Sequence, residues 1–139
     1  MFAAALGHPA LHHVGIVVRD LEAAVARYRA LGFGEPALGD VPDQGVRIAS
    51  FHAGAGYVEL LTPTVPDTGV ARFLEARGEG LHHVAYGVPA LDDVLRRLAA
   101  AGFELIDAHP RRGIHDWRVA FLHPRSCGGV LVELVEVEA

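Results

Sequence analysis

The 139-residue sequence contains no lysine, only one cysteine and no long hydrophobic run. Without lysine, chemistry through a lysine Schiff base is excluded. The single thiol, Cys127, cannot form an internal disulfide, and this usage is typical of the reducing cytoplasm. A transmembrane helix needs about 20 apolar residues in succession, so we expect a cytoplasmic protein without a membrane partner.

The chain has fewer basic than acidic residues. Twelve basic residues, all arginine, stand against seventeen acidic ones and give a net charge of −5. No basic run of the kind that follows a phosphate backbone is present, which argues against a nucleic-acid partner. Hydrophobic residues make up 51% of the chain and the mean hydropathy is +0.27. We therefore predict one globular domain over residues 1–139.

The sequence repeats itself once. Residues 11–34 align with residues 81–104 at an offset of 70 without a gap, and ten of the 24 positions are identical. Chance would give roughly two identities, so the match indicates a duplication. The similarity continues in the segments that follow, with small shifts in offset. We place repeat one at about 11–62, a connector at 63–80 and repeat two at about 81–137.

Each repeat has the pattern of a strand, a helix and three further strands. Period-two alternation predicts strands at 11–18 and 81–88, and each leads into a helical pattern that starts near Asp20 or Ala90. Further strands are predicted near 35–40, 46–53, 56–62, 103–109, 117–123 and 129–137, with a short connector helix near 68–77. This pattern predicts an α+β fold. A tandem βαβββ duplication would form two curved mixed sheets with outer helices and one shared metal-binding cleft.

Two histidines and two glutamates occupy matching positions in the repeats. Side chains alternate along a strand, so His13 and His83 face away from the helix-covered side. Glu59 and Glu133 each lie between two hydrophobic residues that should face the helices. The four side chains are therefore expected to converge in the cleft.

A metal ion would explain this convergence. An ionised carboxylate in an apolar strand costs several kcal/mol unless it is compensated. Two imidazoles and two carboxylates suit a divalent ion such as Co, Mn, Ni, Fe or Zn. A lone strand histidine is more often structural, and the repetition of the pattern is what favours ligands here. His115 lies in a loop that could close over the cleft.

The duplicated pattern resembles the vicinal oxygen chelate (glyoxalase/bleomycin resistance/dioxygenase) superfamily over the whole chain. Within it, several segments are similar to the methylmalonyl-CoA epimerase family. These segments are HHVGIVV at 12–18, QGV at 44–46, VELLTP at 58–63, ARFLEARGEGLHHVAY at 71–86 and FLHPRSCGGVLVEL at 121–134.

The resemblance implies metal ligands at His13, Glu59, His83 and Glu133, a small acyl-CoA substrate and a homodimer. The implied reaction is epimerisation at C2 of methylmalonyl-CoA, in which the metal stabilises the enolate. Glu133 would be both ligand and base. Some family members carry a second carboxylate where this chain has Ile48, which cannot carry a proton. The second acid or base is therefore left open between Glu59, His115 and a water molecule.

Other functions on the same scaffold stay open. A glyoxalase I-type isomerase or an extradiol-type dioxygenase would use the same ligands, although the fourth candidate, Glu59, argues against the dioxygenase. A metal-free small-molecule binding protein is disfavoured because all four ligand residues are present. With no lysine in the chain, the phosphates of a CoA ester would meet arginines or backbone amides, and the candidate loop arginines are Arg111, Arg112 and Arg125.

Overall fold

The computed structural model describes residues 5–138, which divide into two compact units. The first-repeat unit comprises residues 13–82, and the second-repeat unit comprises residues 83–138 together with residues 5–12. Residues 1–4 and 139 of the predicted domain lie outside the described part of the chain. The expectation that both repeats form a single domain remains a prediction.

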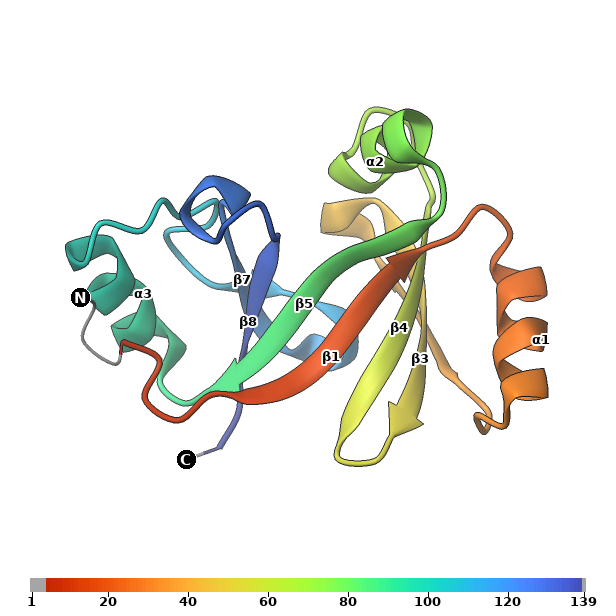
Figure 1. The fold of residues 1–139 in the computed structure, drawn as a ribbon, viewed down its shortest axis with the longest axis horizontal. Coiled ribbons are helices and arrows are strands. Elements are labelled where there is room, and N and C mark those ends of the chain that lie inside the picture. Colours follow the sequence, from red (N-terminus) through yellow and green to blue (C-terminus); the bar gives the residue numbers. More distant parts are fainter. Residues whose placement is uncertain (1–4, 139) are drawn as a thin grey trace. The chain divides into compact units, whose positions relative to one another are not determined.

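The two units contain corresponding elements (Figure 1). The first strand of each repeat, β1 or β5, begins three residues before the unit boundary at residue 13 or 83. The first-repeat unit contains β1 (Ala10–Val17), α1 (Leu21–Leu31), β2 (Ala37–Val41), β3 (Val46–Ala53), β4 (Gly56–Pro63) and α2 (Gly69–Arg77). The second-repeat unit contains β5 (Gly80–Val88), α3 (Leu91–Ala100), β6 (Arg111–Arg112), β7 (Arg118–Leu122) and β8 (Val132–Glu136).

Strand order and direction are the same in both units. The order is β2-β3-β4-β1 in the first-repeat unit and β6-β7-β8-β5 in the second. In each, the first strand of the repeat pairs in parallel with the last, and the other pairs are antiparallel. Each sheet is therefore mixed, and the predicted α+β class with a βαβββ duplication is confirmed.

One predicted strand is wrong. Residues 103–109 form only an isolated bridge between Leu105 and Leu122, and the edge strand is the short β6 instead. Asp107 explains the difference, because its Oδ2 accepts a hydrogen bond of 2.8 Å from the backbone N–H of Phe121. A side chain thus takes the donor that a regular ladder would have used.

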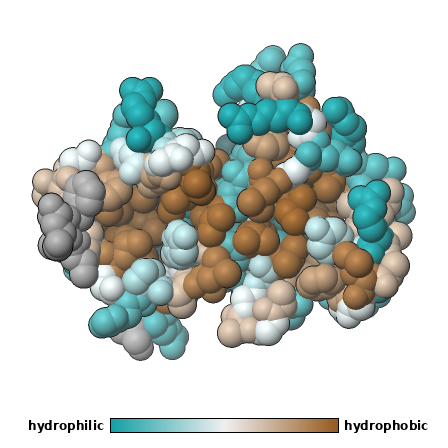
Figure 2. All heavy atoms as spheres, in the orientation of Figure 1, coloured by the Kyte–Doolittle hydropathy of each residue, from teal (hydrophilic) through white to brown (hydrophobic). Residues whose placement is uncertain are grey.

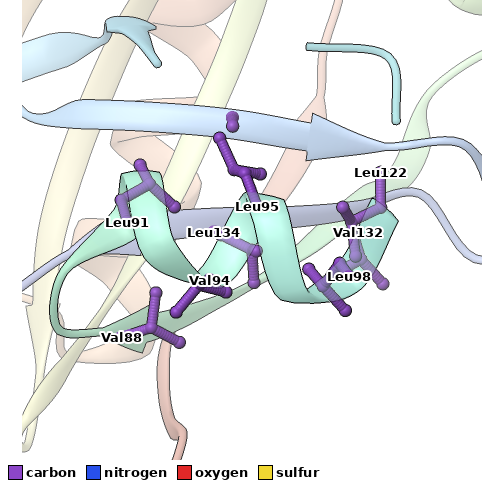
Figure 3. Packing of buried hydrophobic residues seen from close by; sticks show 9 residues of the cluster. Val88, Leu91, Val94, Leu95, Leu98, Leu122, Val132 and Leu134 are labelled. Carbon is purple, nitrogen blue, oxygen red and sulfur yellow. The ribbon is translucent and has the colours of Figure 1, made fainter. Parts of the chain in front are cut away.

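Helices α1 and α3 each cover one face of the sheet in their own unit through a hydrophobic cluster. Figure 3 shows side chains of α3 directed onto those of β7 and β8. The cluster consists of Val88, Leu91, Val94, Leu95, Leu98, Ala120, Leu122, Val132 and Leu134, all at most 8% exposed. In the first-repeat unit the α1 cluster includes a trio of rings, Tyr28, Phe33 and Phe51, with centroids 5.4–5.8 Å apart.

The connector helix α2 contributes little to either cluster. It buries only Val70, and Figure 2 shows hydrophilic side chains gathered over this helix. Within residues 5–138, the helices are too short or too polar for any of them to cross a bilayer.

The α1 and α3 helices begin differently. Asp20 caps α1, because its Oδ1 accepts a hydrogen bond from the backbone N–H of Ala23. The equivalent residue before α3 is Ala90, which has no side-chain acceptor. Glu136 on β8 replaces it by accepting a hydrogen bond of 2.9 Å from the N–H of Leu91. The hydrogen bond from the Arg118 side chain lowers the pKa of Glu136 most, and the hydrogen bond from the Leu91 backbone lowers it further.

This arrangement predicts a pH-dependent contribution of Glu136 to stability. A carboxylate with a lowered pKa in the folded state stabilises the fold above its unfolded pKa of about 4.3, and this stabilisation is lost as the pH falls through the folded value. We expect Glu136→Gln to lower the free energy of unfolding by about 1 kcal/mol at pH 7 and by much less once the pH is below the folded pKa of Glu136. Urea titrations over this pH range measure the difference. The exposed Glu138→Gln variant is the matched control, and a pH-independent loss would contradict the prediction.

Candidate functional site

In the first-repeat unit, strand pairing brings His13 beside Glu59. Strands β1 and β4 run in parallel, with Gly15 level with Glu59. His13 is two residues before Gly15 and therefore projects from the same face of the sheet. Its Nε2 lies 3.3 Å from Oε1 of Glu59. A histidine and a carboxylate 46 positions apart in sequence thus meet because of strand register alone.

The second-repeat unit repeats this geometry with His83 and Glu133. Strands β5 and β8 are parallel, and Ala85 is level with Glu133. His83 again precedes the facing residue by two positions, and its Nε2 lies 2.9 Å from Oε1 of Glu133. Each unit therefore contains one imidazole–carboxylate pair, built by the same register.

The neighbours of both glutamates show which face they occupy. Val58 and Leu60 belong to the α1 cluster, and the residues on either side of Glu133 belong to the α3 cluster. Because side chains alternate along a strand, both carboxylates project from the face opposite the helices. This is the face predicted for them from the sequence.

All four side chains are deeply buried. Exposed fractions are 1% for His13, 2% for Glu59, 3% for His83 and 6% for Glu133. Burying a carboxylate costs several kcal/mol unless a cation or hydrogen-bond donors compensate for the lost water. The imidazole in each unit offers one donor, and as a neutral ring it is also a common metal ligand.

The surroundings of the two pairs differ at one cross-strand position. In the second-repeat unit Phe121 is directly opposite Glu133, and its ring centroid lies 5.7 Å from that of His83 in an edge-on contact. In the first-repeat unit the residue opposite Glu59 is Ser50. Sequence reasoning did not identify Ser50 as a site residue, although the alignment of residues 47–52 with 118–123 places it at the position of Phe121.

Ile48 lies on the same face as Glu59. It faces Leu61 across the β3–β4 pair, is 4% exposed, and precedes Ser50 by two residues. The position that is a carboxylate in some family members is thus directed to the same side of the sheet here, with a side chain that has no acid–base chemistry.

His115 lies in a loop of the second-repeat unit. It is exposed, has a left-handed backbone with φ of 58°, and belongs to the turn Ile114–Asp116. Its ring packs against Trp117 with a centroid distance of 4.9 Å. The ring of His12 also packs against Trp117, with a centroid distance of 4.6 Å.

Arg111 and Arg112, which were expected in a loop, form the short strand β6, and only Arg125 lies in a turn. Each of the three is close to a carboxylate of its own unit. The nitrogen–oxygen distances are 3.3 Å for Arg111–Asp107, 3.4 Å for Arg112–Asp116 and 3.6 Å for Arg125–Glu104. Arg111 also lies over the ring of Phe121, with 5.3 Å between the guanidinium carbon and the ring centroid. A role in CoA binding remains a prediction for all three.

Burial of the His83–Glu133 pair predicts a large cost for truncating one partner. In metal-free protein His83→Ala should lower the free energy of unfolding by about 3 kcal/mol, because it opens a cavity and removes the imidazole 2.9 Å from a buried carboxylate. Chemical denaturation in the presence of a chelator measures this change. The exposed His115→Ala variant is the control, and equal stability of the two variants would contradict the prediction.

Comparison with known proteins identifies the family. The family model of the Glyoxalase/Bleomycin resistance protein/Dioxygenase superfamily matches residues 12–121. The Ethylmalonyl-CoA/methylmalonyl-CoA epimerase of Cereibacter sphaeroides is 40% identical over 130 residues, which cover 91% of this chain and 97% of the relative.

Solved structures agree with this assignment. The crystal structure of methylmalonyl-CoA epimerase from Mycobacterium tuberculosis has a TM-score of 0.90 and 37% identity, over 100% of this chain and 94% of that one. A methylmalonyl-CoA epimerase in complex with methylmalonyl-CoA and NH4+ has a TM-score of 0.89 and 38% identity, over 94% of this chain and 96% of that one. The predicted vicinal oxygen chelate fold is confirmed. The chain belongs to the glyoxalase/bleomycin resistance/dioxygenase superfamily and, within it, to the methylmalonyl-CoA epimerase family.

Proposed function

We propose that this protein is a metal-dependent epimerase that interconverts the C2 epimers of methylmalonyl-CoA. Relatives with 37–40% identity over most of the chain carry this name, and one was solved with methylmalonyl-CoA bound, which supports the reaction and the acyl-CoA substrate. The observation that carries the proposal is the pair of buried imidazole–carboxylate contacts with the same register in both repeats. The proposal includes a cytoplasmic location, expected from the cysteine usage, and a homodimer, which the sequence resemblance implies.

The metal would be held jointly by His13, Glu59, His83 and Glu133. Two neutral imidazoles and two carboxylates match the donor preferences of Co, Mn, Ni, Fe and Zn ions, and the burial of all four agrees with ligands shielded from water. A bound divalent ion supplies positive charge where negative charge develops on the thioester oxygen of the substrate.

Epimerisation requires two acid–base groups. One must remove the proton from C2, and another must deliver a proton to the opposite face of the resulting enolate. We assign the first role to Glu133 and the second to Glu59, with His115 as the alternative for the second. Some family members carry a carboxylate at the position of Ile48. Because isoleucine cannot carry a proton, the second acid–base group must be a different one here.

The assignment predicts isotope exchange at C2. Metal-loaded protein incubated with methylmalonyl-CoA in D₂O should place deuterium at C2 and interconvert the epimers. Glu133→Gln and Glu59→Gln should each slow interconversion by at least about 100-fold, because general acid–base groups contribute on that scale. Mass spectrometry and NMR measure exchange, and Glu138→Gln should behave as wild type. If His115→Ala slowed interconversion by this amount and Glu59→Gln did not slow it, the second role would belong to His115.

Other outcomes would identify other chemistry. The epimerase proposal fails if metal-loaded wild-type protein exchanges no deuterium. Oxygen uptake with catechols that depends on ferrous iron would indicate an extradiol-type dioxygenase. Isomerisation of a glutathione hemithioacetal would indicate a glyoxalase I-type enzyme.

Joint coordination predicts one metal ion per chain. Elemental analysis of protein purified without chelator should find this ratio, and chelation should lower the melting temperature until metal is returned. His13→Ala and His83→Ala should each weaken binding of the same ion, whereas His52→Ala, on the exposed end of β3, should not. Two ions per chain would mean that the pairs bind metal separately. Absence of bound metal together with no thermal shift would favour the metal-free binding class.

A further inference from the structure

Ser50 carries a buried hydroxyl that has no hydrogen-bond partner in the described part of the chain. It is 3% exposed, and its Oγ makes no hydrogen bond with any of the residues 5–138. Buried hydroxyls are nearly always hydrogen-bonded, because a hydroxyl without a partner has lost water and gained nothing in return. The position of Ser50 therefore needs an explanation beyond the stability of the fold.

The register of the first-repeat sheet places Ser50 directly beside the His13–Glu59 pair. Ser50 faces Glu59 across the β3–β4 pair and Ala37 across the β2–β3 pair, while Gly15 on β1 is level with Glu59. Directly paired residues project from the same face of a sheet. In this row of level residues across the four strands, Glu59 supplies a carboxylate and Ser50 a hydroxyl. The other two positions are glycine and alanine.

The equivalent row in the second-repeat unit is filled. There Phe121 is opposite Glu133, and the guanidinium of Arg111 covers its ring. A duplicated pair of glutamates thus has an aromatic neighbour in one unit and a small polar neighbour in the other. Of the two residues that face the glutamates, only Ser50, opposite Glu59, has a side-chain hydrogen-bond donor.

We propose that Ser50 donates a hydrogen bond to the carboxylate of bound methylmalonyl-CoA, an inference that rests on the proposed function. The serine O–H is a donor, and the ionised carboxylate is the strongest acceptor in the acyl portion of this substrate. A substrate carboxylate near Glu59 would be repelled by this group of like charge. The hydroxyl of Ser50, opposite Glu59 on the neighbouring strand, would offset part of that repulsion. Ser50 would then select acyl-CoA esters that carry a carboxylate, without taking part in proton transfer at C2.

The test compares two ligands that differ by this carboxylate. Calorimetry with metal-loaded protein measures Kd for malonyl-CoA and for propionyl-CoA in wild type, Ser50→Ala, Ser50→Thr and Ser126→Ala. We expect Ser50→Ala to weaken malonyl-CoA binding about tenfold, as for a hydrogen bond to a charged group, and to leave propionyl-CoA unchanged. Ser50→Thr, which keeps the hydroxyl, should restore most of the affinity. Ser126, whose Oγ accepts from the N–H of Glu104 in the second-repeat unit, is the matched control.

The same variant has a second, opposite effect on the free protein. Removing an unpartnered buried hydroxyl should raise the urea midpoint of ligand-free Ser50→Ala, while a hydroxyl that supports the fold would make it fall. Equal losses of affinity for both ligands, or no loss for malonyl-CoA in a variant that folds, would overturn the inference. If wild type exchanges deuterium and only the Ser50 result is negative, the epimerase function stands. If wild type neither exchanges deuterium nor binds malonyl-CoA, both proposals fall.

Discussion

The burial of one carboxylate against one imidazole in each repeat is the constraint on which the rest of the molecule depends. Such a carboxylate is costly inside an apolar sheet, and only fixed neighbours make it tolerable. The parallel pairing of β1 with β4 and of β5 with β8 supplies these neighbours. A slip of one residue would turn Glu59 and Glu133 toward the helices and into the α1 and α3 clusters. The hydrophobic residues on either side of each glutamate therefore specify the register that holds the site.

Much of this arrangement could be read from the sequence, because it rests on local periodicity repeated twice. Alternation along the strands predicts the faces of His13 and Glu59, and the duplication transfers the same result to His83 and Glu133. The features that escaped prediction depend on contacts across the sheet. Asp107 takes the N–H of Phe121 and prevents a regular strand at 103–109, and a side chain from β8 caps α3. Neither partner is near the other in sequence, so no local pattern signals them.

Divergence between the repeats matters as much as their likeness. Duplication supplies matching ligand types, but a chiral substrate with one carboxylate and one thioester needs a site whose two sides differ. The positions facing the glutamates differ between the two units, since Phe121 is large and apolar where Ser50 is small and polar. A symmetric pair of aromatic rings would leave the substrate carboxylate without a donor from β3.

The replacement of a carboxylate by Ile48 changes what the first-repeat sheet can contribute to proton transfer. Ile48 and Ser50 share a face of β3, so the polar group on this strand is a hydroxyl rather than an acid. A serine hydroxyl is too weak an acid to reprotonate an enolate near neutral pH without an adjacent general base. It can orient a carboxylate, but it cannot replace one. For proton delivery we therefore propose Glu59, which the same strand pairing places directly opposite Ser50.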